Sequence, residues 1–114
     1  MVPVDFAKDW EAGWNSHDLD RILAHYAEDV VFRSRKAIPL TGQGTVIGKS
    51  ELRAYWANAL TRQPELSFKV TEVFEGHDTL VITYRNHRGV HAAETLLFND
   101  AGLVTEASAS HAGS

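Results

Sequence analysis

Apolar residues in the first half of the chain recur at the three- and four-residue spacings of amphipathic helices. The first such run lies between Pro3 and Asn15, and its apolar residues are Phe6, Ala7, Trp10 and Trp14. We therefore predict a helix over residues 3–15, with Pro3 at a first helical position. A short second helix follows the capping sequence 15–18, with an apolar face of Leu19, Ile22, Leu23 and Tyr26. A third is predicted over residues 49–60, with an apolar face of Leu52, Tyr55, Trp56, Ala59 and Leu60.

The pattern changes to that of β-strands after Pro64, which ends the third helix. Four runs rich in apolar residues are separated by short turn sequences, and they span residues 66–74, 80–86, 90–98 and 103–110. An earlier β-branched and aromatic run predicts a first strand over residues 29–35. Residues 36–48, which include three glycines, are predicted to form a loop long enough to act as a rim or lid. Helices followed by an antiparallel meander predict an α+β fold with the helices on one sheet face.

Composition and charge narrow the classes of function. The 114 residues fit one domain over residues 1–114, and 44% hydrophobic with 23% charged residues is typical of globular proteins. The eleven basic and fifteen acidic residues are scattered, which argues against nucleic acid as a partner. Because the chain has no cysteine, it has no thiolate metal ligand and no cysteine nucleophile. No apolar stretch approaches the ~20 residues that span a bilayer and no leader is visible, so we expect a cytoplasmic protein without a membrane partner.

Three stretches of the chain carry sequence typical of a known family. They are residues 10–32, which begin WEAGWNSHDLD, residues 48–56 (GKSELRAYW) and residues 98–104 (FNDAGLV). Together they resemble the SnoaL-like and ketosteroid-isomerase-like branches of the nuclear transport factor 2-like superfamily. The resemblance implies a cone-shaped roll, in which three N-terminal helices pack on a curved antiparallel sheet around a pocket lined by aromatic residues. It does not fix an activity, because this scaffold hosts isomerases, cyclases, dehydratases, ligand binders and transport modules.

The catalytic groups of a steroid isomerase give the resemblance a first test. Such an enzyme uses a helix-one tyrosine and a protonated carboxyl as oxyanion donors, and a second carboxylate at the end of the first strand as general base. The resemblance places Trp10 at the tyrosine position and Ser34 at the base position, so two of the three groups are missing. The third position falls on Glu94, in a strand where an unpaired buried charge would be costly.

The neighbours of Glu94 depend on the turn that precedes its strand. With a two-residue turn at His87 and Arg88, cross-strand pairing places three residues on the sheet face of Glu94, namely Val81, Thr83 and Arg85. A longer, bulged loop would place Tyr84 there instead. Glu94 is then either an acid, base or ligand-orienting carboxyl in the pocket, or a structural residue that is paired with Arg85 or faces solvent.

His111 and the aromatic residues are the other candidates for the pocket. Strand alternation places His111 on one face with the small residues Ala107 and Ala109, where a histidine could act as acid or base, although a residue so near the chain end is often a surface residue. The aromatic residues are either plain core or the walls of a pocket for flat apolar ligands, and they are Trp10, Trp14, Tyr26, Tyr55 and Trp56.

The sequence does not indicate a metal site or a phosphate-binding site. The six histidines lie singly in turns or on different elements, so we expect no metal, and the glycines of residues 42–48 lack the context of a phosphate-binding loop. We expect no cofactor.

Three hypotheses for the function follow. The first is a SnoaL-like protein that binds a small, mostly apolar or aromatic molecule in the cone. The second is a cofactor-free isomerase, cyclase or dehydratase in which Glu94 or His111 moves a proton. The third is an interaction module that forms a homodimer through the outer sheet face, with an apolar patch of Leu80, Ile82, Tyr84, Ala93, Thr95 and Leu97.

Overall fold

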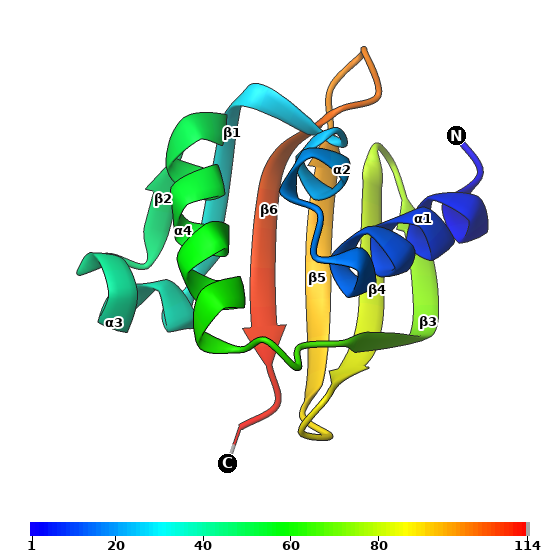
Figure 1. Ribbon diagram of the computed structural model, residues 1–114. Helices are drawn as coiled ribbons and strands as arrows, with labels where there is room; N and C mark the ends of the chain where they lie inside the picture. The colour runs from blue at the N-terminus through cyan, green and yellow to red at the C-terminus, as the bar shows by residue number, and fades with distance from the viewer. Residues whose placement is uncertain (114) are drawn as a thin grey trace.

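The protein has an α+β fold, in which a curved six-stranded sheet is covered on one face by helices (Figure 1). The computed structural model describes residues 1–113. The α-helices are α1 (Pro3–Ser16), α2 (Leu19–Leu23), α3 (Ile38–Thr41) and α4 (Lys49–Arg62), and a 3₁₀ turn spans Arg35–Ala37. The strands are β1 (Tyr26–Ser34), β2 (Thr45–Ile47), β3 (Phe68–Gly76), β4 (Thr79–Asn86), β5 (His91–Phe98) and β6 (Val104–His111). The predicted fold class is confirmed.

The sheet has the order β2-β1-β6-β5-β4-β3 and is not closed. Strands β3 to β6 form the predicted antiparallel meander, but β1 pairs with β6 in parallel. The meander brings the last strand back beside the first, and the two then run in the same direction (Figure 1). Within residues 1–113, no helix has the length and hydrophobicity needed to cross a bilayer.

Two segments differ from their predicted structure. Tyr26 belongs to β1 rather than to helix two, because the pairing of β1 with β6 already begins there, at Val104. Helix α2 is correspondingly short, with the Asp18 carboxylate as its N-cap, accepting from the backbone N–H of Asp20 at 3.0 Å. The predicted loop 36–48 instead contains α3 and the edge strand β2, which pairs with β1 from Val31↔Ile47 to Arg33↔Thr45.

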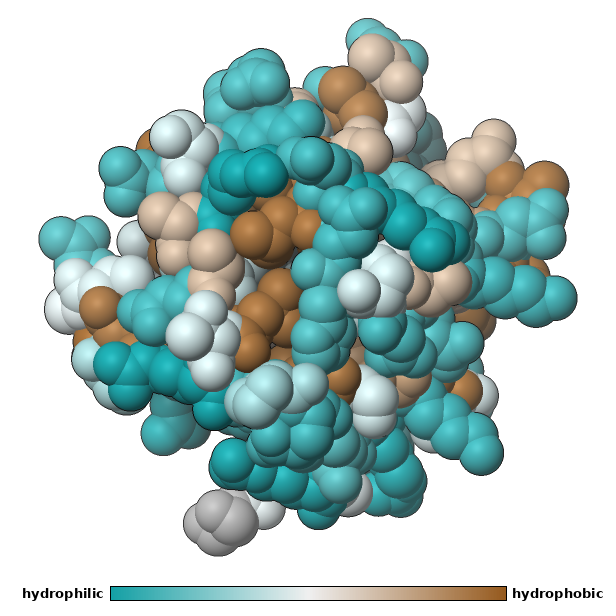
Figure 2. Space-filling model, viewed as in Figure 1, coloured by the Kyte–Doolittle hydropathy of each residue, from teal (hydrophilic) through white to brown (hydrophobic). Residues whose placement is uncertain are grey.

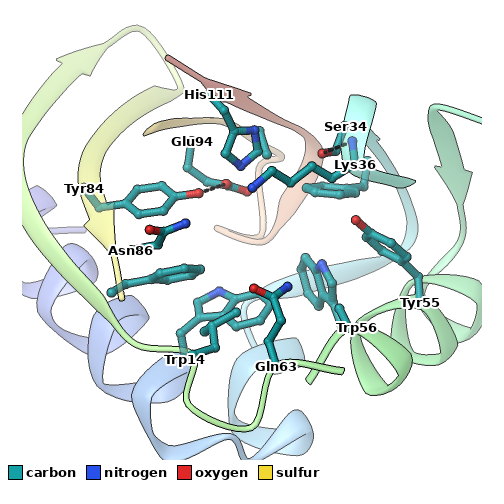
Figure 3. Close-up of a pocket in the computed structure, with 15 residues that line it drawn as sticks. Trp14, Ser34, Lys36, Tyr55, Trp56, Gln63, Tyr84, Asn86, Glu94 and His111 are labelled. Atoms are coloured by element: carbon teal, nitrogen blue, oxygen red, sulfur yellow. Dashed lines mark hydrogen bonds between the residues drawn. The ribbon is translucent and has the colours of Figure 1, made fainter. Parts of the chain in front are cut away.

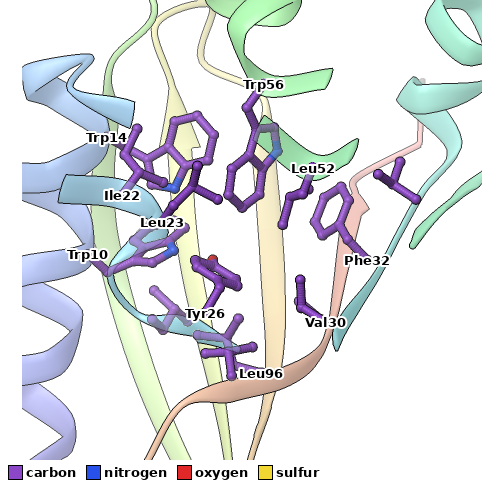
Figure 4. Packing of buried hydrophobic residues seen from close by; sticks show 14 of the residues in the cluster. Trp10, Trp14, Ile22, Leu23, Tyr26, Val30, Phe32, Leu52, Trp56 and Leu96 are labelled. Carbon is purple, nitrogen blue, oxygen red and sulfur yellow. The ribbon is translucent and has the colours of Figure 1, made fainter. Parts of the chain in front are cut away.

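Aromatic side chains fill most of the space between the helices and the sheet (Figure 4). Trp14 of α1 and Trp56 of α4 meet edge to face, with ring centroids 4.8 Å apart. Trp56 also packs against Tyr26, at 5.2 Å, while Trp10 packs against Tyr84 at 5.1 Å. Since such rings bury a large area each, this cluster supplies much of the hydrophobic stabilisation. Part of the space between the helices and the sheet remains as a partly open cavity.

The β4–β5 turn determines which residues share a face with Glu94. Asn86 and Val90 close a three-residue loop, in which Gly89 has a φ of 78° and donates to the Asn86 carbonyl at 2.9 Å. A three-residue loop with glycine in the left-handed conformation is common in β-hairpins. Its extra residue shifts the register by one relative to the predicted two-residue turn, so Ile82 rather than Val81 lies opposite Glu94.

The shift in register corrects two predictions. The side chains of Val81, Thr83 and Arg85 lie on the outer face of the sheet and do not line a pocket. Conversely, Leu80, Ile82 and Tyr84 are buried on the inner face and do not belong to an outer apolar patch. Of the six residues predicted for that patch, the three on β5 keep their place, namely Ala93, Thr95 and Leu97.

Candidate functional site

A cavity of about 90 Å³ lies at the partly open end of the cone, between the sheet, α4 and the segment that joins α4 to β3 (Figure 3). Its walls are mainly aromatic and its polar groups come from the sheet and the rim. The lining residues are Trp14, Phe32, Ser34, Lys36, Tyr55, Trp56, Ala59, Gln63, Leu66, Phe68, Tyr84, Asn86, Glu94, Ala109 and His111. Elsewhere on the helix-covered side, apolar surface is confined to small areas between polar side chains (Figure 2).

Small residues in two rows of the sheet leave room for the cavity. Across β4, β5 and β6, Tyr84 pairs with Ala92 and Ala92 pairs with His111. In the next row Glu94 pairs with Ala109, and Ala109 pairs with Ser34 of β1. Because Ala109 projects only a methyl group, the space above it stays open and belongs to the cavity. Glu94 is then the diagonal neighbour of both Tyr84 and His111, at a Cβ separation of roughly 7–8 Å in such a sheet.

Glu94 is a carboxyl buried against the cavity, with 5% of its surface exposed. The Tyr84 hydroxyl donates a hydrogen bond to Glu94 Oε1 over 3.3 Å. Burial raises the pKa of Glu94 to about 8, and the Tyr84 hydrogen bond opposes that rise. Near pH 7 the carboxyl is therefore mostly protonated and has an O–H to donate. Burial also raises the pKa of Tyr84, so its hydroxyl stays a neutral donor.

His111 and Tyr55 face the same cavity from opposite sides (Figure 3). Burial lowers the pKa of His111, and the positive charge of Lys36 lowers it further, so the imidazole is mainly neutral near pH 7. Burial raises the pKa of Tyr55, an effect that the Ser34 hydroxyl opposes. The site thus places a neutral acid, Glu94, near a neutral base, His111, in mostly apolar surroundings.

Six of the residues predicted for the pocket line this cavity, and they are Trp14, Ser34, Tyr55, Trp56, Glu94 and His111. Trp10 and Tyr26 lie deeper, at 2% and 1% exposure, and belong to the core. Tyr84, the residue expected for a longer turn, takes the place predicted for Arg85, whose guanidinium donates to the Gly89 carbonyl instead.

Several lining residues were not predicted from the sequence. Lys36, Gln63 and Asn86 each end or follow a regular element and fit no catalytic motif. Only Asn86 carried a local signal, because its side chain accepts from the N–H groups of Arg88 and Val90 and so organises the hairpin. Among residues 1–113, no cluster of three or more histidine, aspartate or glutamate side chains is arranged to hold a metal ion.

Comparisons with known proteins agree with this architecture. A SnoaL-like protein of unknown function from Burkholderia thailandensis E264 is 35% identical, with a TM-score of 0.93 over 97% of this chain and 94% of its own. TerC, co-crystallised with polyporic acid, is 20% identical with a TM-score of 0.80 over 97% and 92%. A candidate isomerase of the SnoaL-like family from Agrobacterium tumefaciens C58 is 16% identical, with a TM-score of 0.77 over 97% of both chains.

No curated protein matches this chain significantly. The family model of the SnoaL-like domain matches residues 7–106, which is most of the chain. The protein therefore belongs to the SnoaL-like domain family, within the nuclear transport factor 2-like fold.

Proposed function

We propose that this protein binds a small, mostly apolar molecule in the cavity, and that Glu94 donates a hydrogen bond to a carbonyl oxygen of that molecule. The observation that carries the proposal is a carboxyl that is buried beside Tyr84 at the cavity wall, where burial raises its pKa to about 8. Within residues 1–113, Tyr84 is the single hydrogen-bond partner of the Glu94 carboxyl, and it occupies Oε1. The second oxygen is left to meet a ligand.

The size of the cavity restricts the ligand. Sites for drug-sized molecules usually measure roughly 300–1,000 Å³, whereas a benzene-sized guest fits a dry cavity of about 150 Å³. The 90 Å³ space therefore suits a molecule with one ring, part of which projects through the mouth. TerC, which has this fold, has been co-crystallised with polyporic acid, and this supports a ligand-binding role without naming the ligand.

Acetophenone, a single ring with one carbonyl group, is a suitable probe. Titration with acetophenone should change the fluorescence of Trp14 and Trp56, which line the cavity, in a saturable way. Glu94→Leu, which removes the donor, should weaken binding by about tenfold or more, since a lost hydrogen bond that leaves a buried oxygen unpaired costs ~1–3 kcal/mol. Glu106→Gln is the matched control, because Glu106 lies on the outer face, paired with Arg33. Absence of a saturable response up to about 10 mM in wild-type protein would contradict the proposal.

A second candidate function is cofactor-free isomerase, cyclase or dehydratase activity. The observation that favours it is the pair of neutral groups with opposite roles, since His111 could remove a proton from the carbon beside a carbonyl while Glu94 donates to the oxygen. A positioned base of this kind contributes about 10²–10⁴-fold to a rate. The candidate isomerase of the same fold is compatible with such chemistry.

Hydrogen–deuterium exchange tests this activity without knowledge of the natural substrate. Acetophenone in D₂O should exchange its methyl protons faster with wild-type protein than with Glu94→Gln or His111→Ala. The exchange rate should decrease at pH values below the lowered pKa of His111, because the imidazole becomes charged. It should also decrease at pH values above about 8, because Glu94 ionises. Equal rates for wild type and both variants would exclude these roles, while leaving ligand binding intact.

A further inference from the structure

Lys36 stands at the mouth of the cavity, and we infer that it selects ligands that carry a negative charge at the end facing solvent. The chemical class is a small aromatic or otherwise apolar carboxylate, with its ring in the cone and its anionic group at the rim. This inference rests on the proposed function, because it narrows the class of molecule that the same cavity binds.

The chain directs Lys36 across the mouth rather than away from it. Lys36 follows β1 in the 3₁₀ turn Arg35–Ala37, and the Ser34 hydroxyl oxygen accepts a hydrogen bond from the Lys36 backbone N–H at 3.2 Å. Its side chain then extends over the cavity toward Glu94 and His111 (Figure 3). The preceding residue, Arg35, is also exposed but does not line the cavity. Of these two neighbouring cationic residues, Lys36 lines the cavity and Arg35 does not.

The charge of Lys36 has no counter-ion among the groups that face it. In residues 1–113 Lys36 takes part in no ion pair, whereas Lys49, for example, lies 4.0 Å from a carboxylate oxygen of Glu28. Among residues 1–113, Glu94 is the single carboxyl that lines the cavity, and it is mostly neutral near pH 7 because burial raises its pKa to about 8. The other titratable groups that face the mouth, His111, Tyr55 and Tyr84, are neutral at this pH or nearly so.

The distribution of polarity in the cavity fits an anion only at the rim. Trp14, Trp56 and Phe68 make the interior apolar, and an unpaired charge placed there would be costly. Gln63 and Asn86 stand with Lys36 around the opening and can add amide N–H donors. A ligand with a carbonyl at one end and a carboxylate at the other would satisfy both Glu94 and Lys36 without burying its charge.

A matched pair of probes isolates the charge. 4-Acetylbenzoate and the neutral 4-acetylbenzamide have the same ring, the same ketone and nearly the same shape. Wild-type protein should bind the carboxylate about three- to fivefold more tightly at low salt, a range expected for an ion pair that is partly exposed. Lys36→Gln should remove this preference. Arg35→Gln, the control, removes an equal charge from the neighbouring residue and should keep it.

The dependence on salt tests whether the preference for the carboxylate is electrostatic, and acetophenone tests ligand binding without a charge. The preference should shrink as sodium chloride rises from about 20 to 300 mM, because exposed charges are screened over about 10 Å at 0.1 M. The inference is overturned if wild-type protein binds both probes equally, if the preference persists in Lys36→Gln, or if Arg35→Gln abolishes it to the same degree. In each of these cases binding of acetophenone itself still supports the proposed function. If neither probe nor acetophenone binds, the proposed function fails and the inference fails with it.

Discussion

Replacing Glu94 with glutamine should make the stability of this protein much less dependent on pH. The folded protein holds the Glu94 proton more tightly than the unfolded chain, since burial raises the pKa from 4.5 to about 8. Between these two values the folded state binds more protons, so ionisation favours unfolding. The contribution to stability is complete below about pH 4.5 and is lost as the pH rises through 8. Glutamine resembles the protonated carboxyl in shape and can still accept from Tyr84.

The size of the effect follows from the two pKa values. Each tenfold difference in proton affinity corresponds to about 1.4 kcal/mol, and the difference between pH 5 and pH 9 integrates to about 4 kcal/mol. By pH 7, about 2–3 kcal/mol of this should already be lost. His111 works in the opposite sense, because its lowered pKa makes stability rise as the pH increases through that group's titration. The comparison of wild type with Glu94→Gln cancels that contribution.

Urea denaturation followed by tryptophan fluorescence measures the difference. The free energies of unfolding of wild type and Glu94→Gln should be similar at pH 5, and the variant should be the more stable by about 4 kcal/mol at pH 9. Glu106→Gln, on the outer face, should follow the wild-type curve within about 0.5 kcal/mol. If the wild-type and Glu94→Gln curves run parallel from pH 5 to pH 9, Glu94 titrates normally and is not a neutral donor in the cavity near pH 7.

Three further predictions concern the cavity and the sheet. Ala109→Leu places a larger side chain between Glu94 and Ser34, and should abolish acetophenone binding in the fluorescence titration while the far-ultraviolet circular dichroism is unchanged. The side chains of Glu11 and Asn15 accept hydrogen bonds from the edge strand β3, at 2.6 Å from Val70 N and 2.7 Å from Phe68 N. The double variant Glu11→Ala with Asn15→Ala should lower the free energy of unfolding by about 1–3 kcal/mol and promote aggregation, measured by light scattering. The sequence predicts a homodimer through the outer sheet face, and Leu97→Glu should convert it to a monomer in sedimentation; a wild-type monomer at micromolar concentration would refute the dimer.

The helices could be predicted closely because their signal is local. Apolar spacing predicted residues 3–15 and 49–60, and the structure has α1 at Pro3–Ser16 and α4 at Lys49–Arg62. The end of the second helix was wrong because Tyr26 fits a helical face equally well, and its pairing opposite Val104 lies far along the chain. Likewise, a strand alternates in the same way whether its neighbour is parallel or antiparallel, so the orientation of β1 against β6 had no local signal.

One turn residue determines which side chains surround Glu94 in the candidate site. Resemblance to the family pointed to Glu94, but its partners depended on whether the β4–β5 loop had two or three residues. Gly89 permits the left-handed conformation that makes it three, and this exchanges Arg85 for Tyr84 at the carboxyl. Lys36 could not be predicted, because its relation to the cavity depends on how the turn after β1 meets the ends of β5 and β6.

Glu94 is difficult to explain by stability alone. Ser34 and Glu94 are the buried polar residues of the described core, and Glu94 is the one that carries an ionisable group. A loss of about 2–3 kcal/mol at pH 7 is large against the ~5–15 kcal/mol by which domains are usually stable. Glutamine would keep the packing and avoid that loss, so a role for the proton itself is the simplest reason for a glutamate at this position. Glu94→Gln should therefore both gain stability at neutral pH and lose proton transfer to a bound ketone. A gain in stability without that loss would favour a binding role over catalysis.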